Sequence, residues 1–354
     1  MVRLKDLAEK AGVSVMTISK ALRNAPDISA NTKARIKILA EQMGYVPDSV
    51  AQGLRNRTSK IFGLVIPSMT DPLFARMVSA IETRTRDLGY DLILAHTMGL
   101  AEREESSVKR MLSRRIDGLF ISPVYRLAPS APIYEELKRR RTPTVVLGQC
   151  GPFCNQFANV ESDDVTASQS ATSHLIQLGH KRIAFLSGPL GSPWAHERLE
   201  GYRRALREAD IEPDDSLIFS AGSTIDEGTK AALQLINESV QVTAVQAVND
   251  LVAIGAATVF LNQGIKIPHD LSVVGFGNIL AAEYFRVPLT TLRQPKHRMG
   301  DAAFACMLQL LNGKLPESQR LSADLVIRES TSQAQLLHHP SKKPLSQSEA
   351  RITL

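Results

Sequence analysis

The chain has 354 residues, of which 44% are hydrophobic and 22% charged, and its formal net charge is +6. This composition supports sizeable buried cores and excludes a wholly disordered chain, and the length predicts two or three domains. The three cysteines provide no disulfide framework, no apolar run is long enough to span a membrane, and the polar N-terminus lacks a secretory signal, so we expect a cytoplasmic protein without a membrane segment.

The excess positive charge lies at the N-terminus. Residues 1–60 contain eleven Lys and Arg against five Asp and Glu, whereas residues 61–354 contain 31 of each. A basic segment of this kind is typical of a surface that meets a polyanion such as nucleic acid.

The first segment, LKDLAEKAGVSVMTISKAL, predicts two short helices joined by a tight turn. Apolar residues recur at helical spacing from Leu4, Gly12 permits the turn, and Ser14 is a suitable N-cap for the second helix. In a DNA-binding helix-turn-helix, the first residues of the second helix meet base edges. Here those residues are Val15, Met16 and Thr17. An ordinary helical hairpin is the alternative, and the local charge argues against it.

A loop marked by Asn24 leads to a third helix, predicted from Ser29 to about Met43. Residues 47–57 have the length of a short helix, but so short a helix is marginal in water, so we expect it to fold against a partner. Leu54 lies between two arginines in this segment. Such an apolar side chain can insert between base steps and open a minor groove.

Four motifs occur in order in this region: AGVS at 11–14, TIS at 17–19, GYVP at 44–47 and VAQGL at 50–54. With them, residues 1–60 resemble the headpiece of the lactose-repressor (LacI/GalR) family of bacterial transcription factors. The resemblance implies DNA contacts by Leu4, Ser14, Val15, Met16, Thr17, Ser19, Lys20, Asn24 and Leu54. Lys20 stands where the family usually has Arg, which changes the expected base preference because Lys is a point charge rather than a bidentate fork. Asp48 replaces a usual Asn and Arg3 a usual Ser or Thr cap.

From residue 61, short apolar runs alternate with helical stretches, in one set up to residue 148 and a second set beyond Ser162. Near-continuous apolar strands that alternate with helices predict parallel sheets covered on both faces. We therefore expect an N-terminal all-α helix-turn-helix headpiece followed by an α/β core of two doubly wound parallel-sheet subdomains. A cleft between the subdomains would open at the carboxyl ends of the strands.

The core motifs include DPLF at 71–74, HLIQLGHKRIAFLSGP at 174–189, SVVGF at 272–276 and LTTLRQP at 289–295. They resemble the periplasmic-binding-protein-like core of the same family up to about residue 330. The resemblance implies a headpiece at 1–46, a hinge helix or linker at 47–60, and an effector-binding core at 61–330. Within that core, the N-subdomain covers about 61–161 and 292–322, and the C-subdomain about 162–291 and 323–330. The polar, proline-containing tail at 331–354 is predicted to be mostly disordered.

The resemblance also places six effector-binding residues in the cleft: Asp71, Phe74, Trp194, Arg198, Asn249 and Gly277. Arg198 would hold a ligand hydroxyl or carboxylate, Asn249 would contribute an amide, and the two aromatic rings would supply flat faces. Other interpretations stay open, because Phe74 and Trp194 are equally suited to a core and Asp71 before Pro72 is a helix N-cap by local sequence.

Departures from the family limit the choice of effector. Gly277 stands where a cleft Asp is usual, and a second usual Asp is replaced near Gly148-Gln149, so a sugar would lose two hydrogen-bond acceptors. Ser192 lies where the purine-binding branch carries Arg, which argues against a purine corepressor. We expect a carbohydrate-like effector, neutral or anionic.

No catalytic constellation is recognisable in the sequence. The string after Gly275 fails the dinucleotide fingerprint at Leu280, and His174 and His180 do not have metal-ligand spacing. We therefore predict no enzyme, no cofactor and no metal. The prediction is a homodimeric transcriptional regulator, a repressor, that binds a pseudo-palindromic operator under control of a small effector. The alternatives are a solute- or sugar-binding protein with the same core, and an α/β sugar-metabolising enzyme.

Overall fold

The computed structural model describes residues 2–46 and 58–335 of the chain. The chain forms two compact units, Met1–Ser59 and Lys60–Leu354, and the described part of each has a hydrophobic core of its own. The finer boundaries expected from the sequence, at residues 46, 60, 161, 291, 322 and 330, stay predictions. None of the helices in the described residues is long and apolar enough to cross a membrane.

The smaller unit contains the predicted helix-turn-helix. Its helices are α1 Leu4–Ala11, α2 Val15–Leu22 and α3 Ala30–Gln42. Gly12 ends α1 in the left-handed region, at φ 67°, and Ser14 Oγ accepts a hydrogen bond from Thr17 N at 3.1 Å. Leu7, Ile18 and Ile36, one from each helix, are fully buried together. The predicted turn, cap and helix pair are confirmed.

The first half of the larger unit, which we call the six-stranded half, is built on a parallel sheet with the strand order β11-β5-β4-β3-β1-β2. Its strands are β1 Ile61–Ile66, β2 Asp91–His96, β3 Gly118–Ile121, β4 Thr144–Leu147, β5 Ala158–Ser162 and β11 Gln319–Leu321. Its helices are α5 Pro72–Asp87, α6 Ala101–Ser113, α7 Pro132–Arg140 and α13 Lys296–Leu311.

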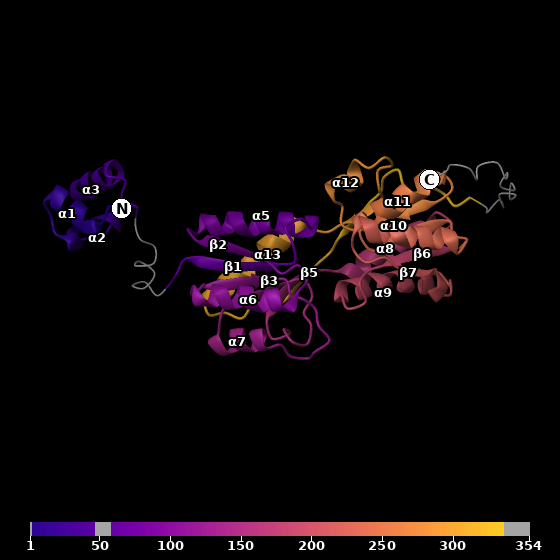
Figure 1. Ribbon diagram of the computed structural model, residues 1–354, viewed down its shortest axis with the longest axis horizontal. Coiled ribbons are helices and arrows are strands. Elements are labelled where there is room, and N and C mark those ends of the chain that lie inside the picture. Colours follow the sequence, from indigo (N-terminus) through magenta and orange to yellow (C-terminus); the bar gives the residue numbers. More distant parts are fainter. Residues whose placement is uncertain (1, 47–57, 336–354) are drawn as a thin grey trace, which may run out of the picture. The chain divides into compact units, whose positions relative to one another are not determined.

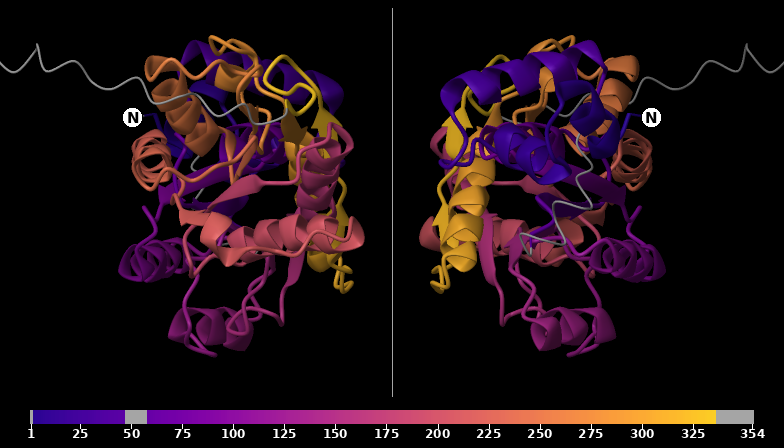
Figure 2. Two further views of the ribbon diagram at one scale, coloured as in Figure 1. Left: turned by 90° about the vertical axis from the view of Figure 1, so that its right-hand side faces the viewer. Right: turned by 90° about the vertical axis from the view of Figure 1, so that its left-hand side faces the viewer.

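Both faces of this sheet are covered by helices, as the continuous apolar strands predicted. Phe62 and Leu64 of β1 pack into the cluster formed with α5 and α13, whereas Val65 packs into the cluster formed with α6 and α7. The two helix pairs lie on opposite faces of the sheet (Figures 1 and 2). The alternation follows from the two-residue period of a strand.

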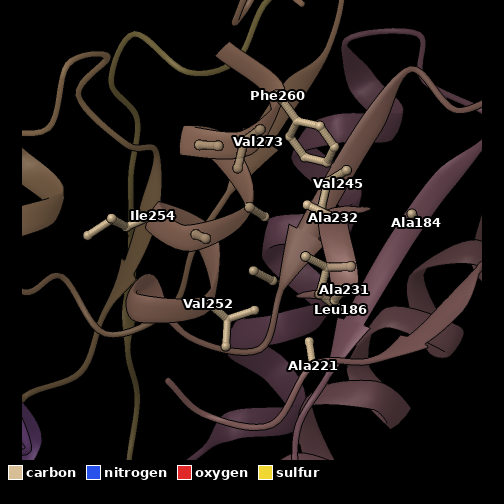
Figure 3. Close-up of a cluster of buried hydrophobic side chains, with 14 of the residues drawn as sticks. Ala184, Leu186, Ala221, Ala231, Ala232, Val245, Val252, Ile254, Phe260 and Val273 are labelled. Carbon is tan, nitrogen blue, oxygen red and sulfur yellow. The ribbon is translucent and has the colours of Figure 1, made fainter. Parts of the chain in front are cut away.

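The second half, which we call the four-stranded half, has a parallel sheet with the order β7-β6-β8-β9. Its strands are β6 Ile183–Ser187, β7 Ile218–Ser220, β8 Ala244–Ala247 and β9 Ser272–Val274. Its helices are α8 Asp164–Gln177, α9 Pro193–Glu208, the 3-10 turn η1 Asp215–Leu217, α10 Ile225–Asn237, α11 Asp250–Asn262 and α12 Leu280–Glu283. Side chains from α10 and α11 meet the strands in one buried cluster, in which Phe260 and Val273 lie close together (Figure 3).

The chain passes between the two halves more than once. After the four-stranded half it returns through β10 Thr291–Arg293 to α13, which packs against α5. It then adds β11 to the six-stranded sheet beside β5 and comes back through β12 Asp324–Val326, which pairs antiparallel with β10. These connecting segments make the two halves one unit.

The prediction of a disordered tail from residue 331 is wrong for its first residues. His174 Nε2 is hydrogen-bonded to Thr331 Oγ1 at 3.1 Å, and His180 Nε2 to Ser332 O at 3.0 Å. Ala334 N donates to Leu178 O at 2.8 Å. Composition does not reveal hydrogen bonds to distant parts of the chain, and through these bonds the polar residues 331–335 stay on the four-stranded half. The rest of the predicted tail, 336–354, lies outside the described residues.

Candidate DNA-binding surface and ligand cavity

The start of α2 presents apolar side chains to solvent, as the sequence predicted. Val15 and Met16 are 43% and 64% exposed. Thr17 is half-buried, and its hydroxyl is 2.9 Å from Ser14 Oγ, so both hydroxyls take part in the helix cap. Met16 and Lys20 lie four residues apart and therefore on one face of the helix. An exposed methionine beside a lysine on a short helix is suited to contacts with thymine methyl groups and guanine acceptors.

The remaining predicted DNA contacts are distributed unevenly. Leu4 is half-buried and packs against the headpiece core, so only part of it faces solvent. Ser19 uses its carbonyl oxygen to accept a hydrogen bond from Arg23 Nε at 2.9 Å. Asn24 is exposed and adopts the left-handed region, at φ 58°, where the chain leaves α2. Leu54 and the predicted hinge helix at 47–57 lie outside the described residues.

Lys20 is engaged by a residue that the sequence did not single out. Its Nζ lies 2.5 Å from Asp27 Oδ2, with the two side chains 38% and 51% exposed. The hydrogen bond from Lys20 holds the pKa of Asp27 below its usual value. Asp27 lies three residues after Asn24 in the loop between α2 and α3, where the sequence indicated only a turn.

In the larger unit, a cavity of about 630 Å³ lies at the carboxyl ends of strands from both halves. All six residues predicted to bind an effector line it: Asp71, Phe74, Trp194, Arg198, Asn249 and Gly277. Three of them, Asp71, Asn249 and Gly277, lie in the loops after β1, β8 and β9. The other three lie in the helices that follow β1 and β6, with Phe74 in α5 and Trp194 and Arg198 in α9. This is where the crossing chain of a doubly wound sheet leaves a crevice for a ligand.

Arg198 is already paired within the protein. It is almost fully buried, and its Nε and Nη2 lie 2.8 and 2.7 Å from Asp164 Oδ2. Its Nη1 donates to Val248 O at 2.7 Å. The guanidinium carbon lies 3.7 Å from the centroid of the Phe276 ring and 4.8 Å from that of Trp194. Asp164 therefore supplies the partner that a buried arginine needs, and a ligand carboxylate would gain less from this cation than the sequence suggested.

Asp71 and Asn249 combine local and cavity roles. Asp71 Oδ1 caps α5 by accepting from Leu73 N at 2.9 Å, so the N-cap interpretation is correct. Burial raises the pKa of Asp71 above its usual value. Asn249 Oδ1 caps α11 by accepting from Val252 N at 2.8 Å, and its Nδ2 donates to Ser223 O at 2.9 Å. Each cap fixes its side chain at the cavity wall.

The two aromatic residues also serve both interpretations. Phe74 is buried in the cluster beneath α5 and α13 and still reaches the cavity wall. Trp194 is half-buried against the core of the four-stranded half, with its ring beside Arg198. The cavity thus has an aromatic face on each side.

Gln149 is a cavity residue that the sequence indicated only as a lost acidic position. It is buried, and neither its Oε1 nor its Nε2 has a hydrogen-bond partner among the described residues. Its backbone carbonyl accepts a hydrogen bond from Tyr125 Oη at 3.0 Å, which fixes the loop. A buried amide without partners costs about 1–3 kcal/mol. A polar ligand group in this cavity would satisfy it.

Gly277 is supported by a buried lysine that sequence reasoning missed. Its φ is 130°, a backbone conformation that residues with a side chain rarely adopt. Lys296 Nζ donates to Gly277 O and, at 3.3 Å, to Asn278 O. Burial lowers the pKa of Lys296, and the negative charge of the nearby Asp250 carboxylate partly offsets this shift. A lysine at the start of a helix gave no signal in the sequence, because its two partners lie in a loop 19 and 18 residues upstream.

Comparisons with known proteins give a family match for each of the two units of the chain. Residues 3–48 match the model of the family described as bacterial regulatory proteins, lacI family, and residues 172–331 match that of the periplasmic binding protein-like domain. The HTH-type transcriptional repressor PurR of Vibrio atlanticus (strain LGP32) is 32% identical over 318 residues, which are 89% of this chain and 93% of PurR. The HTH-type transcriptional repressor CytR of Escherichia coli (strain K12) is 32% identical over 330 residues, 93% of this chain and 96% of CytR.

A solved structure gives the same result for the fold. The lac repressor dimer bound to operator and the anti-inducer ONPF aligns with a TM-score of 0.84 and 28% identity. The alignment covers 94% of this chain and 99% of that chain. The relatives above are named as transcriptional repressors rather than enzymes.

Proposed function

Because this chain belongs to the LacI family of bacterial regulatory proteins, we propose that it is a DNA-binding transcriptional repressor whose affinity for an operator is set by a small ligand. The observation that carries the proposal is the presence of two features in one chain. A basic helix-turn-helix exposes Val15 and Met16 of α2, and a separate unit holds a cavity of about 630 Å³. A protein that only binds a solute has no use for the first feature.

The operator is proposed to be pseudo-palindromic and bound by a homodimer. A helix-turn-helix dimer contacts two half-sites, so the symmetry of the DNA follows that of the protein. The lac repressor, which aligns with this chain over almost its whole length, was solved as a dimer bound to operator.

For the ligand, we propose an uncharged, carbohydrate-like molecule. Among the described residues, the cavity is lined by more acids than bases: Asp71, Glu161, Asp164 and Asp250 against Arg198 and Lys296. Burial raises the pKa of Asp71, Glu161 and Asp250 and lowers that of Lys296, so it disfavours the charged form of these acids and of this base alike. The Arg198 charge is matched by Asp164. An anionic ligand would lose its hydration and meet two cations that already have partners in the protein, Arg198 with Asp164 and Lys296 with two carbonyl oxygens. Hydroxyl groups suit the amides and the aromatic faces of the cavity.

The test is a selection of duplexes from a random-sequence pool by the full chain, followed by a gel shift with the enriched duplex. We expect a two-fold symmetric sequence and release, or tightening, of the complex by one member of a panel of neutral sugars, sugar acids and sugar phosphates. Enrichment of no sequence would overturn the proposed repressor. In that case a solute-binding protein would still respond to the panel in a thermal shift, and a sugar-metabolising enzyme would convert one of its members. A response only to a sugar acid or phosphate would contradict the proposed ligand class.

A further inference from the structure

A carboxylate is fixed on the side of the headpiece where α2 exposes Met16 and Lys20. Asp27 Oδ2 lies 2.5 Å from Lys20 Nζ. The loop that carries Asp27 is held by hydrogen bonds from Ala25 N to Lys20 O at 3.0 Å and from Ile28 N to Ala25 O at 3.3 Å. Ile28 packs against the headpiece core directly after Asp27. The carboxylate is therefore positioned by the fold rather than by a flexible side chain alone.

An anion at this place is costly for contact with DNA unless it has a use there. In residues 2–46 there are three other carboxylates, Asp6, Glu9 and Glu41, which lie on α1 and α3. Of these four carboxylates, Asp27 is the one that forms an ion pair with a side chain of α2 in the described part of the chain. Facing phosphates, it would oppose the sequence-independent attraction that Lys20 provides.

The ion pair leaves hydrogen-bonding capacity on both partners. A lysine ammonium has three donors, of which Asp27 occupies one, and a carboxylate has about four acceptor positions. Both side chains are well exposed, so each can make a further contact without breaking the pair. Held by Asp27, Lys20 is no longer a freely rotating point charge. The pair presents a donor and an acceptor at fixed spacing.

We propose that Lys20 and Asp27 together read one G·C base pair in the major groove, with Lys20 donating to guanine O6 or N7 and Asp27 accepting from the cytosine N4 amino group. This inference rests on the proposed function. In the major groove, guanine offers only acceptors and cytosine offers an amino donor beside them. An A·T pair places a methyl group and the O4 acceptor of thymine there, and O4 would repel the carboxylate. Asp27 is thus the specificity-determining partner of Lys20.

The experiment compares duplexes selected from one random-sequence pool by the full-length wild type, Asp27→Asn and Lys20→Gln. The wild type is expected to require G·C at one position of each half-site. Asp27→Asn should relax the base preference at that position alone. Replacing G·C by A·T there lowers the affinity of each protein by some factor, and this factor should be at least about tenfold smaller for the variant than for the wild type. Lys20→Gln should relax the same position, and the double variant should relax it no further, because the two residues act as one reader.

Glu41→Gln is the matched control, because it removes one negative charge from α3 and leaves Lys20 untouched. It should tighten binding to all duplexes and keep every base preference. An unchanged position-by-position preference in Asp27→Asn, with only a uniform gain in affinity, would overturn the inference while leaving the repressor in place. Relaxation at different positions in Asp27→Asn and Lys20→Gln would also overturn it. A wild type that enriches no sequence would instead overturn the proposed function and this inference with it. Thermal unfolding of each variant checks that the headpiece is folded.

Discussion

At the scale of single residues, the cavity is defined by which polar groups already have partners. Arg198, Asn249 and Asp71 are each satisfied in part by the protein itself. Gln149 is the exception, since both atoms of its buried amide are unpartnered within the described residues. A residue that the fold leaves unsatisfied is a better indicator of ligand contact than one that the fold has used.

This difference predicts opposite effects on stability and binding at Gln149. Gln149→Leu should leave the ligand-free protein as stable or about 1 kcal/mol more stable, because the unpartnered amide is removed. It should lower the affinity for the effector identified with the panel roughly tenfold or more, since a hydrogen-bonding group on the ligand loses its partner. Thermal unfolding without ligand and calorimetric titration with it measure the two effects. Lower ligand-free stability with unchanged ligand affinity would show that Gln149 only fills space.

Arg198 should behave in the opposite way. Arg198→Ala leaves Asp164 buried without its cation, and breaking a buried pair in this manner costs about 3–5 kcal/mol. Arg198→Met combined with Asp164→Asn removes both charges and should recover most of that loss. Denaturant unfolding of the larger unit measures the loss of stability in the single variant and its recovery in the double variant. If the single variant were as stable as the wild type but blind to effector, Arg198 would be a ligand group rather than a structural one.

At the scale of elements, the sequence predicted the strands that are continuous apolar runs and the helices whose apolar residues recur at helical spacing. Apolar runs such as IFGLVI and IAFLS become the buried strands β1 and β6. It missed β5, because ANVES is half polar and is a strand only through its neighbours β4 and β11. It also missed β10, β11 and β12, which are three residues long and pair with segments brought in by the crossings. Pairing energy from distant segments leaves no local pattern.

The same limit applies to the sites. Every residue that the family resemblance implied for the cavity lies at its wall, in a loop or helix that follows a strand. Lys296 and Asp27 were missed, because their importance lies in the partners that they reach, Gly277 and Lys20. The binding of DNA and effector by the predicted residues stays a prediction.

For the element α2, exposure and burial separate readout from folding. Met16 contributes nothing to the headpiece core, so Met16→Ala should change the free energy of unfolding by less than about 0.5 kcal/mol. It should shift base preference at one position of each half-site, because a thymine methyl loses its apolar contact. Ile18→Ala, two residues away and fully buried, should cost about 2–5 kcal/mol and serves as the folding control. Selection of duplexes by each variant gives the preference, and a uniform loss of affinity in Met16→Ala would mean that the residue does not read bases.

At the scale of the whole molecule, the chain joins a helix-turn-helix unit to a larger unit that is built of two halves. The larger unit has two sheets with the cavity between their strand ends, and the chain passes repeatedly from one half to the other. A ligand that contacts both walls favours one arrangement of the halves. Regulation requires only that operator DNA favours one arrangement as well.

Such coupling must be reciprocal, which gives the last prediction. If the effector changes operator affinity by some factor, operator DNA must change effector affinity by the same factor, because both describe one free-energy cycle. Coupling energies of this kind are typically about 1–3 kcal/mol, so we expect a factor of about 5 to 150. The two measurements are a gel-shift titration at zero and saturating effector, and a calorimetric titration of effector with and without the enriched duplex. Glu41→Gln should change operator affinity in both states of the protein equally and leave the factor intact. Unequal factors from the two titrations would mean that effector and operator act on different oligomers, which light scattering of the complexes would then reveal.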